Sequence, residues 1–432
     1  MRISVIGGAG LRLPLLAQGL ATSRLPIREL CLYDTDQEHL ATIAPVAAHY
    51  AKSIRVLTFD NPEACVRGSS FVFLSIRPGQ MDQRARDERI CLKHGVIGQE
   101  TVGAAGFAMA LRAIGPSVNY AKLVQQHAPD AWIINFTNPV SIVTQAVHES
   151  TDARIIGICD TPTELWAEAA EFLHLIPSEC EFDYIGLNHL GFLREVYWQG
   201  KPQLERWWSS PEKLTALYSR PMFRAAQLAA LRLLPSEYLY FYYHSEQALE
   251  HLIQAAHGRG EQLAQQNQML WKQLKQSGDS AIECYEAYLR QRDASYMQAE
   301  TADIRERRAL GRYAQTGYDK IAVKVLEGLY FNTREVLALN VLNHGNIPEL
   351  AEEDVIEVPC VIGSNGPRAL HAGSLPDAIK ELVLQVKRYE RSAVQAAMAQ
   401  DETLAVRALS ENPLIPSVEL ASSLVKALGP FW

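Results

Sequence analysis

Short apolar runs alternate with longer amphipathic stretches through the first third of the chain. The runs are rich in β-branched residues and largely apolar on both faces, which is typical of parallel strands covered by helices. This alternation predicts βαβ units in a doubly wound sheet. The strands are expected at residues 3–6, 29–33, 53–58, 71–76, 132–136 and 154–158.

The pattern changes after about residue 187. Tryptophans, tyrosines and long helical stretches dominate residues 205–329. Two further strands are predicted at 336–340 and 355–362, followed by a helix at about 376–399. Because no repeat, low-complexity tract or Gly/Ser-rich linker interrupts the chain, we expect two closely packed domains with a cleft between them. Their predicted extents are residues 1–187 and 188–432.

The composition of the 432 residues is that of an ordinary globular protein, with 48% hydrophobic and 21% charged residues. A net charge of −8 does not favour binding to nucleic acid or to an anionic membrane. The seven cysteines are scattered and form no CxxC pair, which argues against a disulfide framework or a structural zinc site. Without a signal-peptide pattern or a membrane-length apolar run, the expected location is the cytoplasm.

A glycine-rich turn follows the first strand and contains Gly7, Gly8 and Gly10. Together with a predicted helix at 11–22, it favours a site for the pyrophosphate of a dinucleotide, although the third glycine of the usual motif is missing. Asp34, at the end of the second strand, is placed to bind ribose hydroxyls and to repel a 2′-phosphate. The turn therefore predicts a Rossmann-type domain that binds NAD. The alternative is that Asp34 only caps a helix beginning near Asp36.

Residues 75–106 leave the fourth strand at the edge of the sheet where ligands bind in doubly wound folds. Arginine side chains in this segment are suited to holding a phosphate or a carboxylate by paired hydrogen bonds. The alternative is a solvated helix face, which we expect for at least two of them. They are Arg77, Arg84, Arg86 and Arg89.

Further polar residues follow later strands at the same edge. Asn135 and Asn138 precede a helix and are candidates for ligand binding or for helix capping. Cys159 and Asp160 follow the sixth strand, and His189 lies thirty residues beyond the cysteine. A thiolate and an imidazole in one cleft are suited to a divalent transition metal or to a nucleophile–base pair. The alternatives are a buried core cysteine, a helix-capping aspartate and a structural histidine.

Several motifs follow one another along the chain: GGAG with a downstream YD, RPG…RxxDE…GQETxG, NFTNP, GICDTP, GLNHLGF and PSEYLYFYY. In this order they resemble the motifs of the NAD-dependent glycoside hydrolases of family 4, which lie outside the usual two-carboxylate mechanism. The resemblance extends over most of the chain, including ALNVLNHGNIPELAEEDVIEVPCVIGSNGP.

The resemblance implies a Rossmann domain followed by a mixed α/β domain, related to lactate and malate dehydrogenases. It also implies NAD⁺ and Mn²⁺ as cofactors, a phosphorylated sugar as substrate, and a homodimer or homotetramer. In this family, hydride leaves the sugar C3 for NAD⁺, a base removes the C2 proton, and the C1 aglycone is eliminated. Water then adds and the hydride returns.

The resemblance also assigns roles to individual residues. Cys159 and His189 match the metal ligands, and Tyr238 matches the base at C2, although Tyr240, Tyr242 and Tyr243 lie close to it in sequence. Arg84 and Asn138 are expected to bind the substrate, with Arg84 contacting its phosphate. The cofactor is expected to contact Gly7, Gly8, Gly10, Asp34 and Arg77.

The linkage that the enzyme cleaves is less clearly indicated. Family members cleaving α-linked 6-phosphoglucosides typically carry Asp-Met-Pro after the metal-binding cysteine, whereas β-specific members carry Asn, then Val or Ile, then Pro. This chain carries Asp160-Thr161-Pro162, which matches neither pattern. The resemblance leaves two roles for Asp160, a general acid toward the leaving group or a residue that orders water beside the metal. RPGQ, GQETVGAAG and PSEYLYFYY favour a 6-phospho-β-glucosidase. The family's second phosphate contact has only Arg312 as a rough counterpart, so a glycosidase of the same family that acts on unphosphorylated sugars is an alternative.

Two other functions remain open from the sequence. A plain NAD-dependent hydroxy-acid dehydrogenase is compatible with the fold but leaves Cys159 and His189 without a role. A non-enzymatic NAD-binding sensor requires only the first domain, and the polar residues at successive strand ends argue against it.

Overall fold

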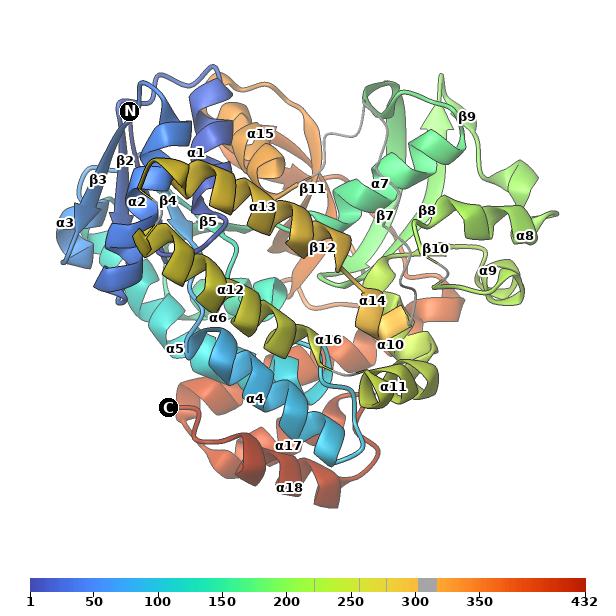
Figure 1. Ribbon diagram of the computed structural model, residues 1–432. Coiled ribbons are helices and arrows are strands. Elements are labelled where there is room, and N and C mark those ends of the chain that lie inside the picture. Colours follow the sequence, from blue (N-terminus) through green and yellow to red (C-terminus); the bar gives the residue numbers. More distant parts are fainter. Residues whose placement is uncertain (221, 256, 277, 302–316) are drawn as a thin grey trace.

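A nine-stranded sheet forms the core of the computed structural model, which describes residues 1–432 except 221, 256, 277 and 302–316 (Figure 1). Its strands are β1 (Arg2–Ile6), β2 (Glu29–Tyr33), β3 (Arg55–Phe59), β4 (Phe71–Leu74), β5 (Trp132–Asn135), β6 (Arg154–Gly157), β11 (Val336–Leu342), β12 (Val355–Gly363) and β13 (Gly366–Ala369). Their order is β13-β12-β11-β6-β5-β4-β1-β2-β3. The strands β1 to β6 are parallel, so the predicted doubly wound sheet is confirmed.

Helices cover both faces of this sheet, which explains why its strands are apolar on both sides. Strand β4, for example, is buried along its whole length. One group of helices that pack on one another is α1 (Leu13–Thr22), α2 (Gln37–Ala51) and α15 (Tyr318–Phe331). A second group is α3 (Pro62–Val66), α5 (Gly103–His127), α6 (Val140–Ser150) and α16 (Asp377–Ala399).

The last three strands of the large sheet come from the C-terminal part of the chain. Strand β11 runs antiparallel to β6 and β12, and β13 forms the edge. The large sheet therefore continues across the predicted boundary at residue 187. The division into residues 1–187 and 188–432 stays a proposal.

A smaller, four-stranded sheet lies beside β12. It contains β7 (Cys180–Leu187), β8 (Leu190–Trp198), β9 (Lys201–Pro202) and β10 (Leu234–Pro235). Strands β7 and β8 form an antiparallel hairpin in which Leu187 pairs with Leu190, so Asn188 and His189 form its turn. Helix α7 (Thr161–Phe172) connects the two sheets.

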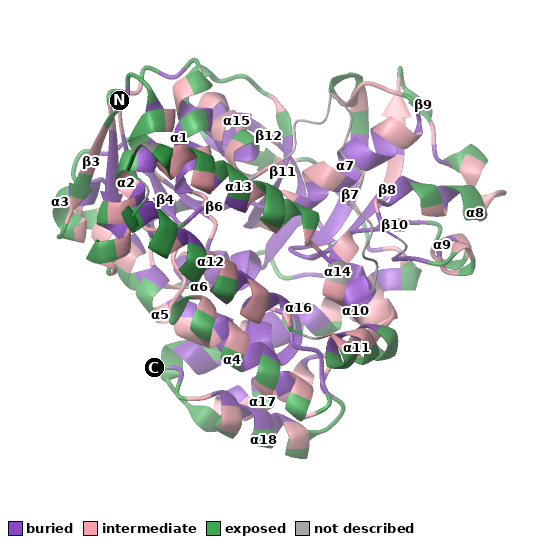
Figure 2. Cartoon of the chain, viewed as in Figure 1, coloured by how far each residue is buried: buried purple, intermediate pink, exposed green. Residues whose placement is uncertain are grey.

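The remaining helices lie around these two sheets. Helix α12 (Arg259–Gln276) packs against α4 (Gln80–Lys93) and α13 (Ala281–Ala294). Exposed residues follow the outward sides of α12 and α13, whereas β4 and the second half of β7 are buried (Figure 2). No helix in the described part of the chain is both long and apolar enough to cross a lipid bilayer. The remaining helices around the two sheets are α4 (Gln80–Lys93), α8 (Pro211–Leu214), α9 (Ala225–Leu231), α10 (Tyr240–Tyr243), α11 (Ser245–Gln254), α12 (Arg259–Gln276), α13 (Ala281–Ala294), α14 (Gln298–Thr301), α17 (Glu402–Glu411) and α18 (Val418–Leu428).

Candidate active site

A cavity of about 2000 Å³ opens at the carboxyl ends of β1, β2, β4 and β6. In a doubly wound fold this edge is the expected place for ligands, because the strand-to-helix turns leave a crevice there. The α12–α13 pair and the β7–β8 turn complete its walls. Most of the residues predicted from the sequence line it, namely Gly7, Gly10, Asp34, Arg77, Arg84, Asn138, Cys159, Asp160, His189 and Tyr238.

The glycine turn lies directly against the ends of β2 and β4. The backbone amides of Gly7 and Gly8 donate to the carbonyl of Tyr33, at 3.0 and 2.9 Å. Gly7 has a φ of +92°, and a Cβ atom there would lie 2.0 Å from the carbonyl oxygen of Ser75. Only glycine therefore fits this position, which brings the backbone close to any ligand in the cavity.

Asp34 fastens the end of β2 to the same turn. Its Oδ2 atom accepts from the backbone amide of Ala9 at 2.9 Å, and its Oδ1 atom accepts from the amide of Asp36. Asp36 is the residue that caps α2, because its carboxylate accepts from the amide of His39. Asp36 therefore caps α2, whereas Asp34 lines the cavity.

Helices α12 and α13 cover this end of the cavity. The Trp271 indole stacks on the imidazole of His39, with centroids 4.2 Å apart, and Lys275 forms an ion pair with Glu38. The Tyr285 hydroxyl donates to the carbonyl of Leu11 at 2.7 Å. The position of α12 and α13 over this end of the cavity was not predicted from the sequence, because both helices come from a stretch without a recognisable motif.

Cys159 and His189 meet deep in the cavity. The Cys159 Sγ atom lies 3.5 Å from Nε2 of His189, and both side chains are buried. Burial lowers the pKa of His189 to about 4, so its imidazole is neutral at physiological pH. Burial and the nearby Glu357 carboxylate raise the pKa of the Cys159 thiol. A neutral imidazole beside a sulfur atom provides two ligands for a borderline-soft metal ion.

The phenol of Tyr238 stacks on the imidazole of His189, with centroids 3.9 Å apart and an angle of 16° between the rings. Its hydroxyl lies 3.4 Å from the hydroxyl of Tyr296, which in turn donates to the Glu237 carboxylate. Burial and the Glu237 carboxylate raise the pKa of Tyr238. Among the four tyrosines at 238–243, all of them described, Tyr238 is the one that lines the cavity.

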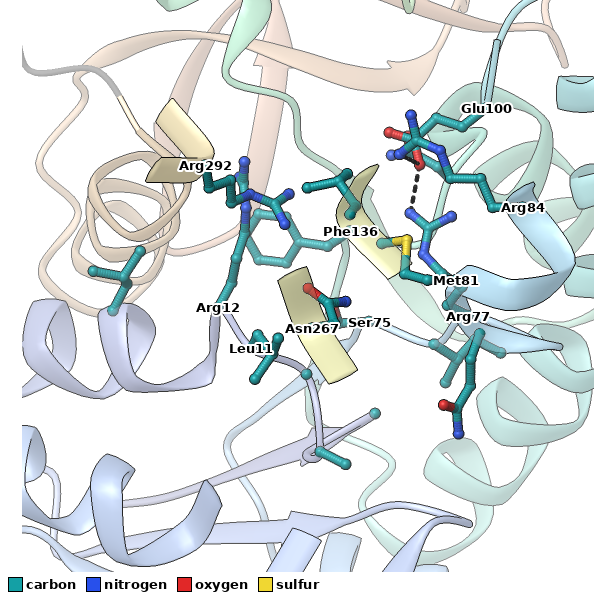
Figure 3. A pocket seen from close by; sticks show the side chains of 18 of the residues that line it. Leu11, Arg12, Ser75, Arg77, Met81, Arg84, Glu100, Phe136, Asn267 and Arg292 are labelled. Atoms are coloured by element: carbon teal, nitrogen blue, oxygen red, sulfur yellow. Dashed lines mark hydrogen bonds and ion pairs between the residues drawn. The ribbon is translucent and has the colours of Figure 1, made fainter. Parts of the chain in front are cut away.

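Two arginines converge on Glu100 at one side of the cavity (Figure 3). The guanidinium groups of Arg77 and Arg84 each lie 2.7 Å from Glu100 Oε2. Although burial opposes it, these two cations hold the pKa of Glu100 below its usual value. Arg84 also donates to Glu88, which accepts from the amide of Gly260 at the start of α12. Arg84 is therefore already paired with two carboxylates.

A second pair of arginines, Arg12 and Arg292, lies together near Phe136 (Figure 3). Burial and the neighbouring Arg12 cation lower the pKa of Arg292. Arg12 also lies 3.7 Å from the carboxylate of Asp160. Two cations this close favour binding of an anion between them. The sequence did not single out either arginine.

Other sequence candidates have structural roles. Arg86 and Arg89 are exposed on α4, as expected for at least two of the four arginines. Arg86 donates to the carbonyls of residues 427–429, and Arg89 lies 4.0 Å from Glu261. The Asn135 amide donates to Thr144 within the fold, whereas Asn138 lines the cavity. Asp160 makes no side-chain hydrogen bond to cap α7. Arg312 lies outside the described residues.

Two family models together match almost the whole chain. The family model described as "Family 4 glycosyl hydrolase" matches residues 2–175, and its C-terminal domain matches residues 184–415. A "Probable 6-phospho-beta-glucosidase" of Bacillus subtilis is 30% identical to this chain, and the match covers 98% of this chain and 95% of that protein.

Solved structures agree with the family models. The 6-phospho-beta glucosidase of Thermotoga maritima, solved with manganese, NAD⁺ and glucose-6-phosphate, is 28% identical, with a TM-score of 0.82. The match covers 99% of this chain and 97% of that one. A 6-phospho-alpha-glucosidase from gut microorganisms, solved with NAD and glucose-6-phosphate, is 26% identical, with a TM-score of 0.81 and coverage of 99% and 96%.

The fold extends beyond the glycosidases. A lactate dehydrogenase of Eimeria maxima is similar over 92% of this chain and 96% of its own, with a TM-score of 0.53 at 15% identity. This likeness confirms the predicted dehydrogenase-like fold. Together, the family models and the near-complete coverage of the glycosidases establish that the chain belongs to glycosyl hydrolase family 4.

Proposed function

We propose that this chain hydrolyses 6-phospho-β-glucosides with the help of NAD⁺ and a divalent metal, Mn²⁺. The observation that carries the proposal is the cluster of Cys159, His189 and Tyr238, which lies in the same cavity as a dinucleotide-binding turn. A plain hydroxy-acid dehydrogenase needs the turn but gives this cluster no role. Relatives named as 6-phospho-β-glucosidases support the substrate class.

The donor atoms fit a metal ion. With the bond lengths of zinc as a guide, about 2.3 Å to sulfur and about 2.0 Å to nitrogen, two ligand atoms roughly 90–110° apart are separated by about 3.0–3.5 Å. The separation of 3.5 Å between Cys159 Sγ and His189 Nε2 is within that range. No group of three or more His, Cys, Asp or Glu side chains suited to a metal occurs in the described part of the chain. Cys159 and His189 would therefore hold Mn²⁺ together with oxygen atoms of substrate or water.

The residues at the other end of the cavity fit NAD⁺. The Gly7 turn admits a close approach of the pyrophosphate, and the Asp34 carboxylate lies where ribose hydroxyls bind. A 2′-phosphate would meet the negative charge of Asp34, so NAD⁺ is favoured over NADP⁺. Arg77, which lines the same cavity, is assigned to the cofactor as well.

When bound, NAD⁺ supplies the hydride acceptor and Mn²⁺ the Lewis acid that stabilises negative charge on the sugar oxygens. Tyr238 removes the proton at the sugar C2, and the adjacent Tyr296 and Glu237 provide a path by which that proton leaves. Because burial raises the pKa of Tyr238, this step requires a bound cation that stabilises the phenolate. Asn138 and Arg84 bind the sugar at the cavity wall.

The 6-phosphate is assigned chiefly to Arg292 and Arg12. Arg84 is already paired with two carboxylates, which reduces its attraction for a phosphate. Arg12 and Arg292 lie next to one another at the cavity, and although Arg12 also lies 3.7 Å from the Asp160 carboxylate, a phosphate dianion would offset the repulsion between the two cations. The free thiols of all seven cysteines fit a location in the reducing cytoplasm. For the oligomeric state we expect a homodimer or homotetramer.

The experiment offers p-nitrophenyl β-D-glucoside 6-phosphate with NAD⁺ and Mn²⁺ under reducing conditions. We expect release of nitrophenol without accumulation of NADH. The α-linked and the unphosphorylated glucosides are tested side by side. Cleavage of only the α-linked 6-phosphoglucoside would favour the alternative function, a 6-phospho-α-glucosidase in which Asp160 protonates the leaving group. Net NADH production without glycoside cleavage would contradict the proposal and favour a dehydrogenase.

A further inference from the structure

Glu357 is the third residue of β12 and is fully buried between the two sheets. Three neutral groups donate to its carboxylate: the Tyr184 hydroxyl at 2.9 Å, the Asn188 amide at 3.0 Å and the Asn340 amide at 2.9 Å. Among the described residues, no lysine or arginine forms an ion pair with it. Burying a carboxylate costs free energy, and the hydrogen bonds that the carboxylate accepts offset this cost. The groups that donate these hydrogen bonds are therefore held in place around it.

Two of these donors lie in the hairpin that carries His189. Tyr184 belongs to β7, and Asn188 immediately precedes His189 in the two-residue turn. His189 has a φ of +60°, which is the left-handed region that a non-glycine residue rarely adopts. Such a conformation persists only where surrounding contacts fix it. The hydrogen bond from Asn188 to Glu357 is a contact of this kind.

The third donor lies beside the strand that leads to Cys159. Asn340 of β11 pairs with Gly157, the last residue of β6 and two residues before Cys159. A Cβ atom on Gly157 would lie 2.8 Å from Cβ of Asn340, so the two strands are in close contact there. The position of Asn340 is therefore coupled to the backbone that places Cys159.

We propose that Glu357 is a positioning residue which holds His189 at the correct distance from Cys159 for metal binding. Asn188 and Asn340 donate to the same oxygen atom, Oε1 of Glu357. That one atom joins the turn carrying His189 to the strands that place Cys159, although the two residues come from different sheets. The inference rests on the proposed metal role of Cys159 and His189.

The test measures Mn²⁺ affinity directly, from the electron paramagnetic resonance signal of free Mn²⁺ in titrations of the full-length protein. Substituting a group that orients metal ligands typically weakens affinity by about 10- to 100-fold. We expect that loss for Glu357→Ala, with NAD⁺ affinity unchanged. Glu357→Gln keeps an oxygen acceptor and should recover most of the Mn²⁺ affinity. Such a recovery distinguishes positioning from a general loss of structure.

Two further variants complete the design. Glu168→Gln is the matched control, because Glu168 is a buried carboxylate that accepts from the amide of Ser219, and it should leave Mn²⁺ affinity unchanged. Asn188→Ala removes only the hydrogen bond from Asn188 to Glu357, and we expect it to weaken Mn²⁺ binding several-fold. This variant tests the positioning role of Glu357 if Glu357→Ala does not fold. Folded variants of Glu357 and Asn188 with the wild-type Mn²⁺ affinity would overturn the proposal. Absence of Mn²⁺ binding by the wild-type protein would instead overturn the metal role of Cys159 and His189, and this inference with it.

Discussion

The phenol ring of Tyr238 lies flat against the imidazole of His189, with ring centroids 3.9 Å apart. The stack places a potential proton acceptor beside a potential metal ligand. It also fixes the plane of the imidazole, because both rings are buried. Binding of the metal and removal of a substrate proton are therefore expected to take place at adjoining atoms.

Tyr238→Phe tests the assignment of the base. The phenylalanine ring retains the stack on His189 but has no hydroxyl, so binding of Mn²⁺ and NAD⁺ should be unchanged. Loss of a general base typically lowers kcat by about 10²- to 10⁴-fold. Steady-state kinetics with the β-linked 6-phosphate substrate measure this loss.

Tyr243→Phe is the matched control for that variant. The Tyr243 hydroxyl is buried without a hydrogen-bond partner in the described structure, and it does not line the cavity. Its removal should leave kcat unchanged. Equal losses of kcat in the two variants would contradict the role of Tyr238.

Cys159→Ser tests the metal site. Serine replaces a side chain that binds metal as an anionic thiolate with a hydroxyl that stays neutral, so Mn²⁺ affinity should fall by more than about 10-fold. A ligand that binds only the folded protein raises its melting temperature. We therefore expect Mn²⁺ to raise the Tm of the wild-type protein but not that of Cys159→Ser. Cys284→Ser, on the far less buried thiol of α13, should respond to Mn²⁺ like the wild type.

Arg292→Gln tests the assignment of the phosphate. A charge-assisted hydrogen bond contributes about 1.5–3 kcal/mol, so KM for the phosphorylated substrate should rise by about 10- to 100-fold. The kcat/KM for an unphosphorylated glucoside should change little. Arg388→Gln, on the exposed side of α16, removes the same charge and should leave both values unchanged. A weaker affinity for NAD⁺ with an unchanged KM would move Arg292 to the cofactor's pyrophosphate.

The first six strands could be predicted from the sequence because each is a short apolar run between helices. The pairing of β6 with β11, which adds β11, β12 and β13 to the sheet, could not, since it joins segments far apart in the chain, at Gly157 and Asn340. The observed ends differ from the predicted ones by up to two residues: the strand expected at 53–58 is Arg55–Phe59, and that expected at 71–76 is Phe71–Leu74. Such ends depend on hydrogen bonds between strands, which a pattern of residue types does not record.

The candidate site was predictable where strands end and where motifs are local. Cys159 and Asp34 follow apolar strands directly, so their place at the sheet edge was evident. Arg292 and Trp271 reach the same cavity from long helices in which each looks like an ordinary amphipathic residue. Glu357, inside an apolar strand, gave no signal either, because its partners come from two other segments, the β7–β8 hairpin and β11.

Asp34→Ser tests the choice of cofactor. The Asp34 carboxylate accepts from the amide of Ala9 and faces the cavity, so its loss removes both a ribose contact and a repulsion against a 2′-phosphate. The affinity for NAD⁺ should fall by about 10-fold or more, while that for NADP⁺ should fall less or rise. Fluorescence titration with the two reduced cofactors measures the ratio.

Asp36→Ser supplies the contrast, because Asp36 lies only two residues further on but caps α2 through the amide of His39. Serine is itself a good cap, so the free energy of unfolding should change by less than about 1 kcal/mol, and the preference for NAD⁺ should persist. If Asp36→Ser relaxed the preference as much as Asp34→Ser, discrimination would arise from the general negative charge of the loop. A selective effect of Asp34→Ser would instead tie the choice of NAD⁺ to the one carboxylate that also holds the glycine turn.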